Sequence, residues 1–228
     1  MLNFVDVYKR YDNGTLALNK INLSINDEEF VFLVGTSGSG KSTLLKLILR
    51  EELMTGGEIY FKGLELSKLD RKEVLEVRRQ LGIVFQDFRL LPNKTAYENV
   101  AYAMEVVEKG ERKIKKEVPR VLSLVGLSDK ANRYPGELSG GEQQRIAIAR
   151  AIVNEPDLII ADEPTGNLDP ENSRDIIKIF EEINRSGTTV LIATHEKGIV
   201  DEMKKRVVEI DKGMIVRDEE KGFYSNEN

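Results

Sequence analysis

Residues 35–43 constrain the fold of this chain more than any other stretch. Their sequence, Gly-Thr-Ser-Gly-Ser-Gly-Lys-Ser-Thr, fits the pattern G-x-x-x-x-G-K-[ST] of loops that surround phosphate groups with backbone N–H groups. Residues 30–34, just before the loop, are all apolar, which predicts a strand buried on both faces. Residues 44–49, just after it, predict a helix whose N-terminus faces the phosphates. The stretch therefore predicts the strand–loop–helix unit of an α/β protein that binds a nucleoside triphosphate.

Two side chains of this loop have expected chemical roles. Lys41 can reach the β- and γ-phosphates of the nucleotide, and the Ser42 hydroxyl can ligate Mg²⁺. The alternative interpretation is a Gly/Ser-rich surface turn with a stray lysine, which the flanking strand and helix disfavour. The residues expected to bind the triphosphate are Gly35, Thr36, Ser37, Gly38, Ser39, Gly40, Lys41, Ser42 and Thr43.

Composition excludes several other classes of protein. The chain has no cysteine, which excludes disulfides, thiolate metal sites and thiol catalysis. Its formal net charge of −5 does not favour binding to nucleic acid or to an anionic membrane surface. No apolar run approaches the ~20 residues that a membrane-spanning helix needs. Any role at a membrane is therefore expected to come through a partner.

The remaining sequence alternates between strand-like and helix-like patterns. Antiparallel strands are expected in residues 1–34 and a short hairpin in residues 55–63. Helical patterns dominate the middle of the chain, where helices are expected near residues 67–80, 95–107, 111–125 and 142–153. Further strands are expected at residues 81–85, 158–161 and 188–194, followed by a hairpin at residues 206–217. The polar tail from Asp218 to Asn228 is expected to fray.

Polar side chains follow three of the apolar strands, at the edge where open α/β sheets bind their ligands. Asp162, after residues 158–161, is placed to hold Mg²⁺, and Glu163 is the candidate general base for the attacking water. Alone, this acidic pair would be interpreted as a cap on the turn before Pro164. Gln86, after residues 81–85, could complete the Mg²⁺ shell or position the water.

His195 is the only histidine in the chain and follows residues 188–194. A lone histidine is most often structural or on the surface. At the end of this strand it could donate a hydrogen bond to the γ-phosphate and hold the water in line with Glu163. His195, Glu163 and Lys41 are therefore the candidate catalytic residues.

A second candidate for anion binding is the sequence Leu-Ser-Gly-Gly-Glu at residues 138–142. Ser139 can cap the helix that follows, while Gly140 and Gly141 allow a phosphate to approach the N–H groups. The alternative is an ordinary capped helix start. Since one nucleotide already has the loop of residues 35–43, a second site suits the nucleotide of another subunit.

These motifs, in this order, resemble those of the ATPase subunits of ABC transporters. The resemblance covers residues 11–213 and includes Asn-Leu-Asp at residues 167–169. It implies an α/β phosphate-loop NTPase core with an antiparallel β-layer and an inserted α-helical subdomain. The implied domains are residues 1–87, 88–156 and 157–228. It also implies a homodimer that sandwiches two ATP molecules and hydrolyses them.

The resemblance assigns further residue roles. Tyr11 would stack on adenine, and Asp169 would couple the two sites of the dimer. The residues that would contact the partner's nucleotide are Ser139, Gly140, Gly141 and Glu142. The Mg²⁺ ligands would be Ser42, Gln86 and Asp162.

A finer resemblance rests on residues 88–95 and 50–53, which are similar to the FtsE family of cell-division ATPases. That family pairs with the membrane protein FtsX and controls hydrolases that cut septal peptidoglycan. An FtsX-like subunit would dock near Phe88, Leu90 and Leu91 and hold the chain at the cytoplasmic face of the plasma membrane. The alternative is the motor of a lipoprotein-release or macrolide-export transporter.

Two more distant interpretations are disfavoured. Soluble ABC ATPases that act on DNA or ribosomes usually carry a long coiled coil or a second cassette, neither of which is present in this sequence. No nucleic-acid partner is therefore expected. A non-catalytic nucleotide-binding module would not need Glu163 and His195.

Overall fold

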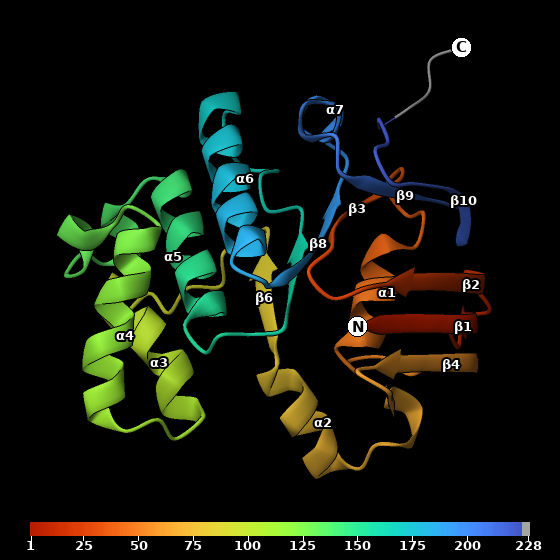
Figure 1. The fold of residues 1–228 in the computed structure, drawn as a ribbon, viewed down its shortest axis with the longest axis horizontal. Helices are drawn as coiled ribbons and strands as arrows, with labels where there is room; N and C mark the ends of the chain where they lie inside the picture. Colours follow the sequence, from red (N-terminus) through yellow and green to blue (C-terminus); the bar gives the residue numbers. More distant parts are fainter. Residues whose placement is uncertain (225–228) are drawn as a thin grey trace. The chain divides into compact units, whose positions relative to one another are not determined.

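The computed structural model describes residues 1–224, which form two compact units. Unit 1 contains Met1–Arg78 and the residues from Thr189 onward, and unit 2 contains residues 79–188. Figure 1 labels the elements of both units. The expected domains, residues 1–87, 88–156 and 157–228, stay a prediction, because packing within one chain does not define parts that fold separately.

Unit 1 contains an antiparallel sheet with the strand order β2-β1-β4-β5. Its strands are β1 (Leu2–Arg10), β2 (Leu16–Ile25), β4 (Gly56–Phe61) and β5 (Leu64–Glu65). Figure 1 shows β1 between β2 and β4, in agreement with the pairing of Phe4 with both Leu23 and Ile59. The antiparallel strands expected in residues 1–34 are therefore present. The hairpin expected at residues 55–63 is only part of the arrangement, since β4 pairs mainly with β1.

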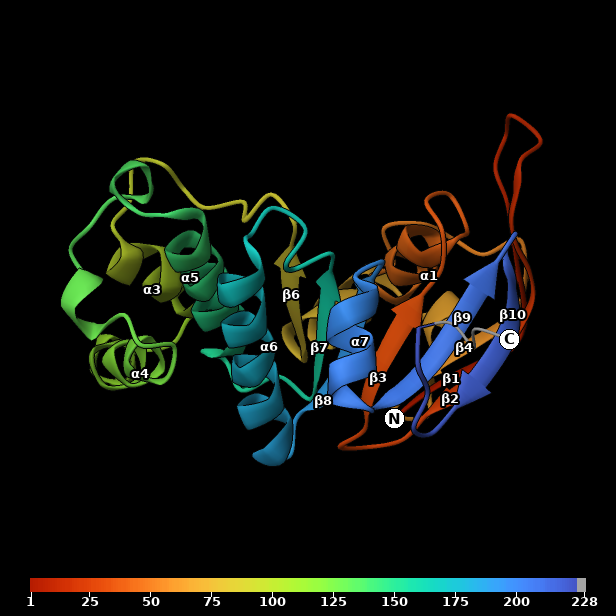
Figure 2. The ribbon, with the colours of Figure 1, turned by 90° about the horizontal axis from the view of Figure 1, so that it is seen from above.

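Parallel strands form the other layer of unit 1. They are β3 (Phe30–Val34), β8 (Thr189–Thr194) and β9 (Arg206–Asp211), and β10 (Met214–Glu219) is added antiparallel to β9. The helices of this unit are α1 (Lys41–Ile48), the 3₁₀ turn η1 (Leu66–Lys68), α2 (Arg71–Arg79), whose last residue belongs to unit 2, and α7 (Lys197–Met203). All five residues of β3 are buried, as its apolar sequence predicts. In Figure 2, β3 lies beside β9.

The expectation that the tail frays from Asp218 onward is wrong for its first residues. Asp218 and Glu219 belong to β10. The Arg206 guanidinium donates to both oxygens of Asp218, over 2.8 Å in each case. This pair holds the strand in place. The rest of the expectation falls partly on residues 225–228, which lie outside the described part of the chain.

Unit 2 combines two parallel strands with a group of helices. The strands are β6 (Leu81–Phe85) and β7 (Leu158–Asp162), and Phe85 pairs with Asp162. The helices are α3 (Ala96–Val106), α4 (Glu111–Leu124), α5 (Gly140–Ile152) and α6 (Pro170–Arg185), with the 3₁₀ turns η2 (Ser128–Lys130) and η3 (Pro135–Glu137). Figures 1 and 2 both show α5 beside α6.

The helices expected in residues 95–153 are confirmed, with one difference at the start of α5. This helix begins at Gly140, two residues before the expected start at residue 142. Ser139 caps it so that Gly140 and Gly141 lie in its first turn. None of the helices in the described part of the chain has the length and hydropathy needed to span a bilayer.

Candidate functional site

The loop of residues 35–43 depends on two glycines that accept no side chain. Gly35 has a φ of 148°, and a β-carbon there would lie 2.2 Å from the Ile210 carbonyl oxygen. Gly40 has a φ of 119°, and its β-carbon would lie 2.8 Å from the Ala17 carbonyl oxygen. Both positions need the left-handed backbone that glycine adopts without strain. The loop is therefore packed against other backbone segments on two sides.

The Lys41 side chain points back into its own loop. Its Nζ donates to the carbonyl oxygens of Gly35, over 2.6 Å, and Thr36, over 3.1 Å. Lys41 is only 7% exposed, so its charge is held inside the loop. The neighbouring Ser39 Oγ is also buried and has no hydrogen-bond partner among the described residues. A cationic amine and a spare hydroxyl in one loop suit an anionic ligand.

The start of α1 carries no negative charge that would compete with such a ligand. Gly40 caps the helix without a side chain, and its first turn contains no acidic residue. The first N–H groups of a helix lack partners within the helix and attract anions. The loop and the helix start together therefore form a phosphate cradle.

A cavity of about 360 Å³ opens beside the cradle. The residues that line it are Tyr11, Thr15, Leu16, Ala17, Gly38, Ser39, Gly40, Lys41, Ser42, Thr43, Lys212 and Gly213. Tyr11 reaches the loop itself, because its hydroxyl lies 3.3 Å from Thr43 Oγ1. The structure thus brings an aromatic ring and the phosphate cradle together in unit 1, and stacking of Tyr11 on adenine stays a prediction.

His195 lies at the same edge of unit 1 as the cradle. Val34 pairs with Thr194 in the parallel ladder between β3 and β8, so Gly35 and His195 are the next residues of two adjacent strands. His195 is exposed. This placement agrees with the expected edge of the sheet, and the catalytic role of His195 stays a prediction.

The predicted acidic and amide residues gather in unit 2. Because Phe85 pairs with Asp162, Gln86 and Glu163 are the first residues after two paired strands. The side chain of Asn167 donates to the Gln86 carbonyl oxygen over 3.0 Å. Glu163 has a φ of 48°, a left-handed conformation that is uncommon for a residue with a β-carbon. Such strain is often found at functional positions, which supports a role for Glu163.

The sequence Leu-Ser-Gly-Gly-Glu forms a complete capping box at the start of α5. Ser139 Oγ accepts from the Glu142 N–H over 3.3 Å, and Glu142 Oε2 accepts from the Ser139 N–H over 2.8 Å. The hydrogen bond from the Ser139 backbone lowers the pKa of Glu142. Glu142 therefore fixes the cap, and we infer that its role in the site is to shape the start of α5.

Gly141 connects this helix start with α6. A β-carbon on Gly141 would lie 2.6 Å from Asn172 Oδ1. Asn172 in turn donates through Nδ2 to Asp169 Oδ2 over 2.5 Å, and its own N–H donates to Asp169 Oδ1 over 3.0 Å. These bonds lower the pKa of Asp169, first through the Asn172 backbone. Asn172 lies between Asp169 and the helix start at residues 139–141, so the structure brings these two predicted sites together. Asn172 is a residue that sequence reasoning missed.

The 88–92 segment, which follows Gln86, has a strained backbone. Phe88 has a φ of 57° and Arg89 a φ of 49°. Arg150 on α5 donates to both of their carbonyl oxygens, over 2.8 Å to Phe88 and 2.5 Å to Arg89. Burial is the main reason that the pKa of Arg150 is lowered, and the charge of Arg89 lowers it further. Arg150 is thus a second residue that sequence reasoning missed.

Asn99 fixes the end of the same segment. Its side chain is fully buried and exchanges hydrogen bonds with the backbone of Leu91, over 2.7 Å and 3.1 Å. It also donates to the carbonyl oxygens of Lys94 and Thr95. Phe88, Leu90 and Leu91 are half-buried. The apolar residues predicted for docking are therefore presented on a fixed backbone.

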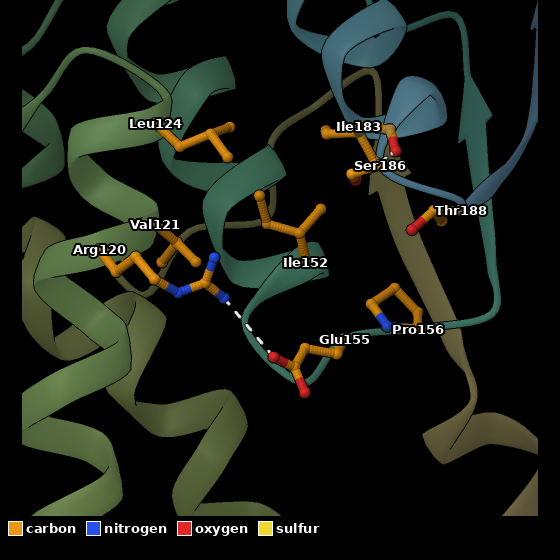
Figure 3. Close-up of a pocket in the computed structure, with 9 residues that line it drawn as sticks. All are labelled: Arg120, Val121, Leu124, Ile152, Glu155, Pro156, Ile183, Ser186 and Thr188. Carbon is orange, nitrogen blue, oxygen red and sulfur yellow. Dashed lines mark hydrogen bonds and ion pairs between the residues drawn. The ribbon is translucent and has the colours of Figure 1, made fainter.

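A further cavity in unit 2, of about 340 Å³, lies apart from these motifs. Figure 3 shows it between the ends of α4, α5 and α6, where the exposed pair of Arg120 and Glu155 spans 3.7 Å. Leu124, Ile152 and Ile183 supply its apolar side. None of the predicted site residues lines it. We therefore do not include this cavity in the candidate site.

Comparison with known proteins identifies the family. Residues 18–166 match the model of the ABC transporter family. The cell division ATP-binding protein FtsE of Bacillus subtilis (strain 168) is 54% identical over 226 residues, which cover 99% of each chain. The chain belongs to the ABC transporter family, in its FtsE group. The FtsE protein of Escherichia coli (strain K12) is 45% identical over 215 residues, which cover 94% of this chain and 97% of that one.

Solved structures agree with the assignment to the ABC transporter family. A dimeric bacterial ABC transporter cassette has a TM-score of 0.88 and 37% identity, and the match covers 98% of this chain and 100% of that one. A dimeric ATP-binding cassette in a post-hydrolysis state, bound to ADP and Pi, has a TM-score of 0.87 and 36% identity with the same coverage. The predicted ABC ATPase fold and the resemblance to FtsE are therefore confirmed. The roles of the individual site residues stay predictions.

Proposed function

We propose that this chain is the ATP-binding and ATP-hydrolysing subunit of a membrane-associated complex that acts in bacterial cell division. The observation that carries the proposal is the phosphate cradle, which opens beside Tyr11 into a cavity of about 360 Å³. The cell-division part is supported by FtsE relatives with 45% to 55% identity over nearly the whole chain.

In this proposal the phosphate cradle holds the triphosphate of ATP while Tyr11 stacks on the adenine. Lys41 exchanges its two loop carbonyls for the β- and γ-phosphates, which are stronger acceptors for an ammonium group. Ser42, Gln86 and Asp162 would hold Mg²⁺. Hydroxyl, amide and carboxylate oxygens are the ligands that this hard cation prefers, so the donor set fits the ion.

Hydrolysis is assigned to Glu163 and His195. Glu163 acts as the general base for the attacking water, a role that typically contributes a factor of about 10²–10⁴. His195 orients that water and the γ-phosphate. Both residues directly follow strands, which place them more rigidly than a free loop would.

We further propose that two copies of the chain bind two ATP molecules between them. At the start of α5, Ser139, Gly140 and Gly141 would contact the partner's γ-phosphate, and Glu142 would act through the cap. Asp169 would couple the two sites, since Asn172, which donates to Asp169, lies against Gly141. The dimeric state of two similar solved cassettes supports this part.

The membrane partner in this proposal is an FtsX-like subunit that docks near Phe88, Leu90 and Leu91. This docking would hold the chain at the cytoplasmic face of the plasma membrane. There the complex would control the hydrolysis of septal peptidoglycan. The 88–92 segment suits a docking role because Arg150 and Asn99 fix its backbone before any partner binds.

Two variants of the purified chain test the proposal in the presence of Mg²⁺. Lys41→Ala should lose ATP binding, whereas Glu163→Gln should bind ATP and release phosphate about 10²–10⁴ times more slowly than the wild type. Glu163→Gln should also sediment as a dimer when ATP is added. Calorimetry, phosphate release and sedimentation measure the three quantities.

Each result has a contrary outcome. Normal phosphate release by Glu163→Gln would remove the general-base assignment. A monomer that stays monomeric with ATP bound would contradict the sandwich. If an exporter subunit co-purified with the chain in place of an FtsX-like protein, the cell-division role would be wrong while the ATPase assignment would stand.

A further inference from the structure

Lys9, next to the last residue of β1, is an unusually buried lysine. It is 7% exposed, and its Nζ lies 4.7 Å from the centroid of the Tyr11 ring, over the face of that ring. Burial of an ammonium group is unfavourable unless partners replace the lost water. A lysine at this place therefore needs a reason beyond packing.

Two fixed acceptors hold the Lys9 ammonium in one position. Its Nζ donates to Glu52 Oε2 over 2.7 Å and to the Leu53 carbonyl oxygen over 2.9 Å. The Glu52 N–H in turn donates to the Lys46 carbonyl oxygen over 3.3 Å. Lys46 belongs to α1, the helix that continues from the phosphate cradle. The position of the cation is thus tied to the helix that carries the cradle.

The Tyr11 ring contacts the Lys9 cation and also lines the cavity beside the cradle. Tyr11 is among the residues that line the cavity beside the cradle, and Lys9 is not. An ammonium group over an aromatic face is attracted by the electron density of that face. Because Lys9 lies over one face of the ring, we expect a flat ligand in the cavity to stack on the other face.

We propose that Lys9 is a positioning residue for nucleotide binding, which holds the Tyr11 ring at a fixed distance from the phosphate cradle so that it stacks on the base. The inference rests on the proposed function, in which Tyr11 stacks on adenine. The Tyr11 hydroxyl, 3.3 Å from Thr43 Oγ1, fixes the far end of the ring in the same way. The ring is held over its face by Lys9 and at its hydroxyl by Thr43. The side chain of Tyr11 therefore needs no further ordering when ATP binds.

Lys9→Met tests this role, because methionine keeps most of the length of the side chain without its charge. The variant should bind ATP about threefold to thirtyfold more weakly than the wild type, the range that a cation–π contact implies. Inorganic tripolyphosphate, which has no base, should bind to both proteins equally. Calorimetry in the presence of Mg²⁺ measures both ligands, and circular dichroism without nucleotide reports the fold.

Three further variants separate positioning from a structural role. In a Tyr11→Leu background, Lys9→Met should cause no additional loss of ATP affinity. Lys9→Arg, which keeps a cation over the ring, should retain more affinity than Lys9→Met. If Lys9→Met does not fold, Glu52→Gln removes the counter-charge of Lys9 and should show the same selective loss for ATP.

An equal loss of affinity for ATP and tripolyphosphate would mean that Lys9 only supports the fold, and the proposal would be wrong. Unchanged ATP affinity in a folded Lys9→Met variant would also overturn it, while leaving the proposed function intact. A different failure is a wild-type chain that binds ATP no more tightly than tripolyphosphate. That result would remove adenine stacking by Tyr11, and the role of Lys9 with it.

Discussion

Arg150→Met would remove the group that holds the strained 88–92 segment. The guanidinium donates to the carbonyl oxygens of Phe88 and Arg89, whose φ angles of 57° and 49° are left-handed. That conformation costs a residue with a β-carbon about 1–2 kcal/mol. Hydrogen bonds to a charged group contribute about 1.5–3 kcal/mol each, so the two bonds offset the strain of the two residues. Methionine would fill the space of the aliphatic stem and leave the strain uncompensated.

The expected effect is a local opening at Arg89. The lower estimate for two charge-assisted bonds is about 3 kcal/mol, and solvent around this partly exposed contact is expected to reduce it by about half. The remaining ~1.5 kcal/mol makes the open state about tenfold more populated. Trypsin cleaves after arginine, so the first cut after Arg89 should become about tenfold faster when opening is rapid. Mass spectrometry of the early fragments measures this rate.

Arg145→Met is a matched control on the same helix. Arg145 forms an ion pair with Asp175, over 3.1 Å, and forms no hydrogen bond or ion pair with the 88–92 segment in the described part of the chain. Its loss should leave cleavage after Arg89 unchanged. Equal cleavage rates in the wild type and Arg150→Met would refute the argument, since they would mean that the segment keeps its conformation without the guanidinium.

Two further variants test the predicted roles of other residues. His195→Ala should slow phosphate release at least about tenfold with unchanged ATP affinity, because His195 is exposed and would act on the water; equal turnover would make it a surface residue. Leu90→Glu should keep ATP binding but prevent co-purification with an FtsX-like membrane subunit, because it would place a charge at the half-buried Leu90 of the proposed docking segment. An intact membrane complex would contradict this docking position.

The parts of the structure that follow from local sequence could be predicted. The strand, loop and helix around residues 35–43 lie where the pattern of apolar residues and glycines places them. Asp169 and Pro170 begin α6 as an N-cap and a first helical residue should. These features depend on neighbours in the sequence, so hydrophobic periodicity and turn chemistry are enough to find them.

Contacts between distant residues could not be predicted in the same way. Lys9 donates to Glu52, which lies 43 residues later in the chain. Arg150 donates to Phe88, which lies 62 residues earlier. The prediction that the tail frays from Asp218 is wrong for the same reason, because Arg206 holds Asp218 across a hairpin. A single sequence contains no sign of which lysine or arginine finds such a partner. These residues are nevertheless the ones that fix the Tyr11 ring and the 88–92 segment.

The helix α5 joins the two predicted functions of unit 2. Its thirteen residues, Gly140–Ile152, follow the cap at Ser139, which is predicted to contact the partner's ATP. Near the other end of the helix, Arg150 holds the 88–92 segment. Ser139 and Arg150 are separated by about 16 Å along the axis, at a rise of about 1.5 Å per residue. The helix is continuous between these two residues, and Arg145 binds it to α6 through Asp175. We therefore expect a displacement of the 88–92 segment by a docked subunit to reach Ser139 through the helix, because Arg150 holds the segment near one end of α5 and the capping box fixes the other.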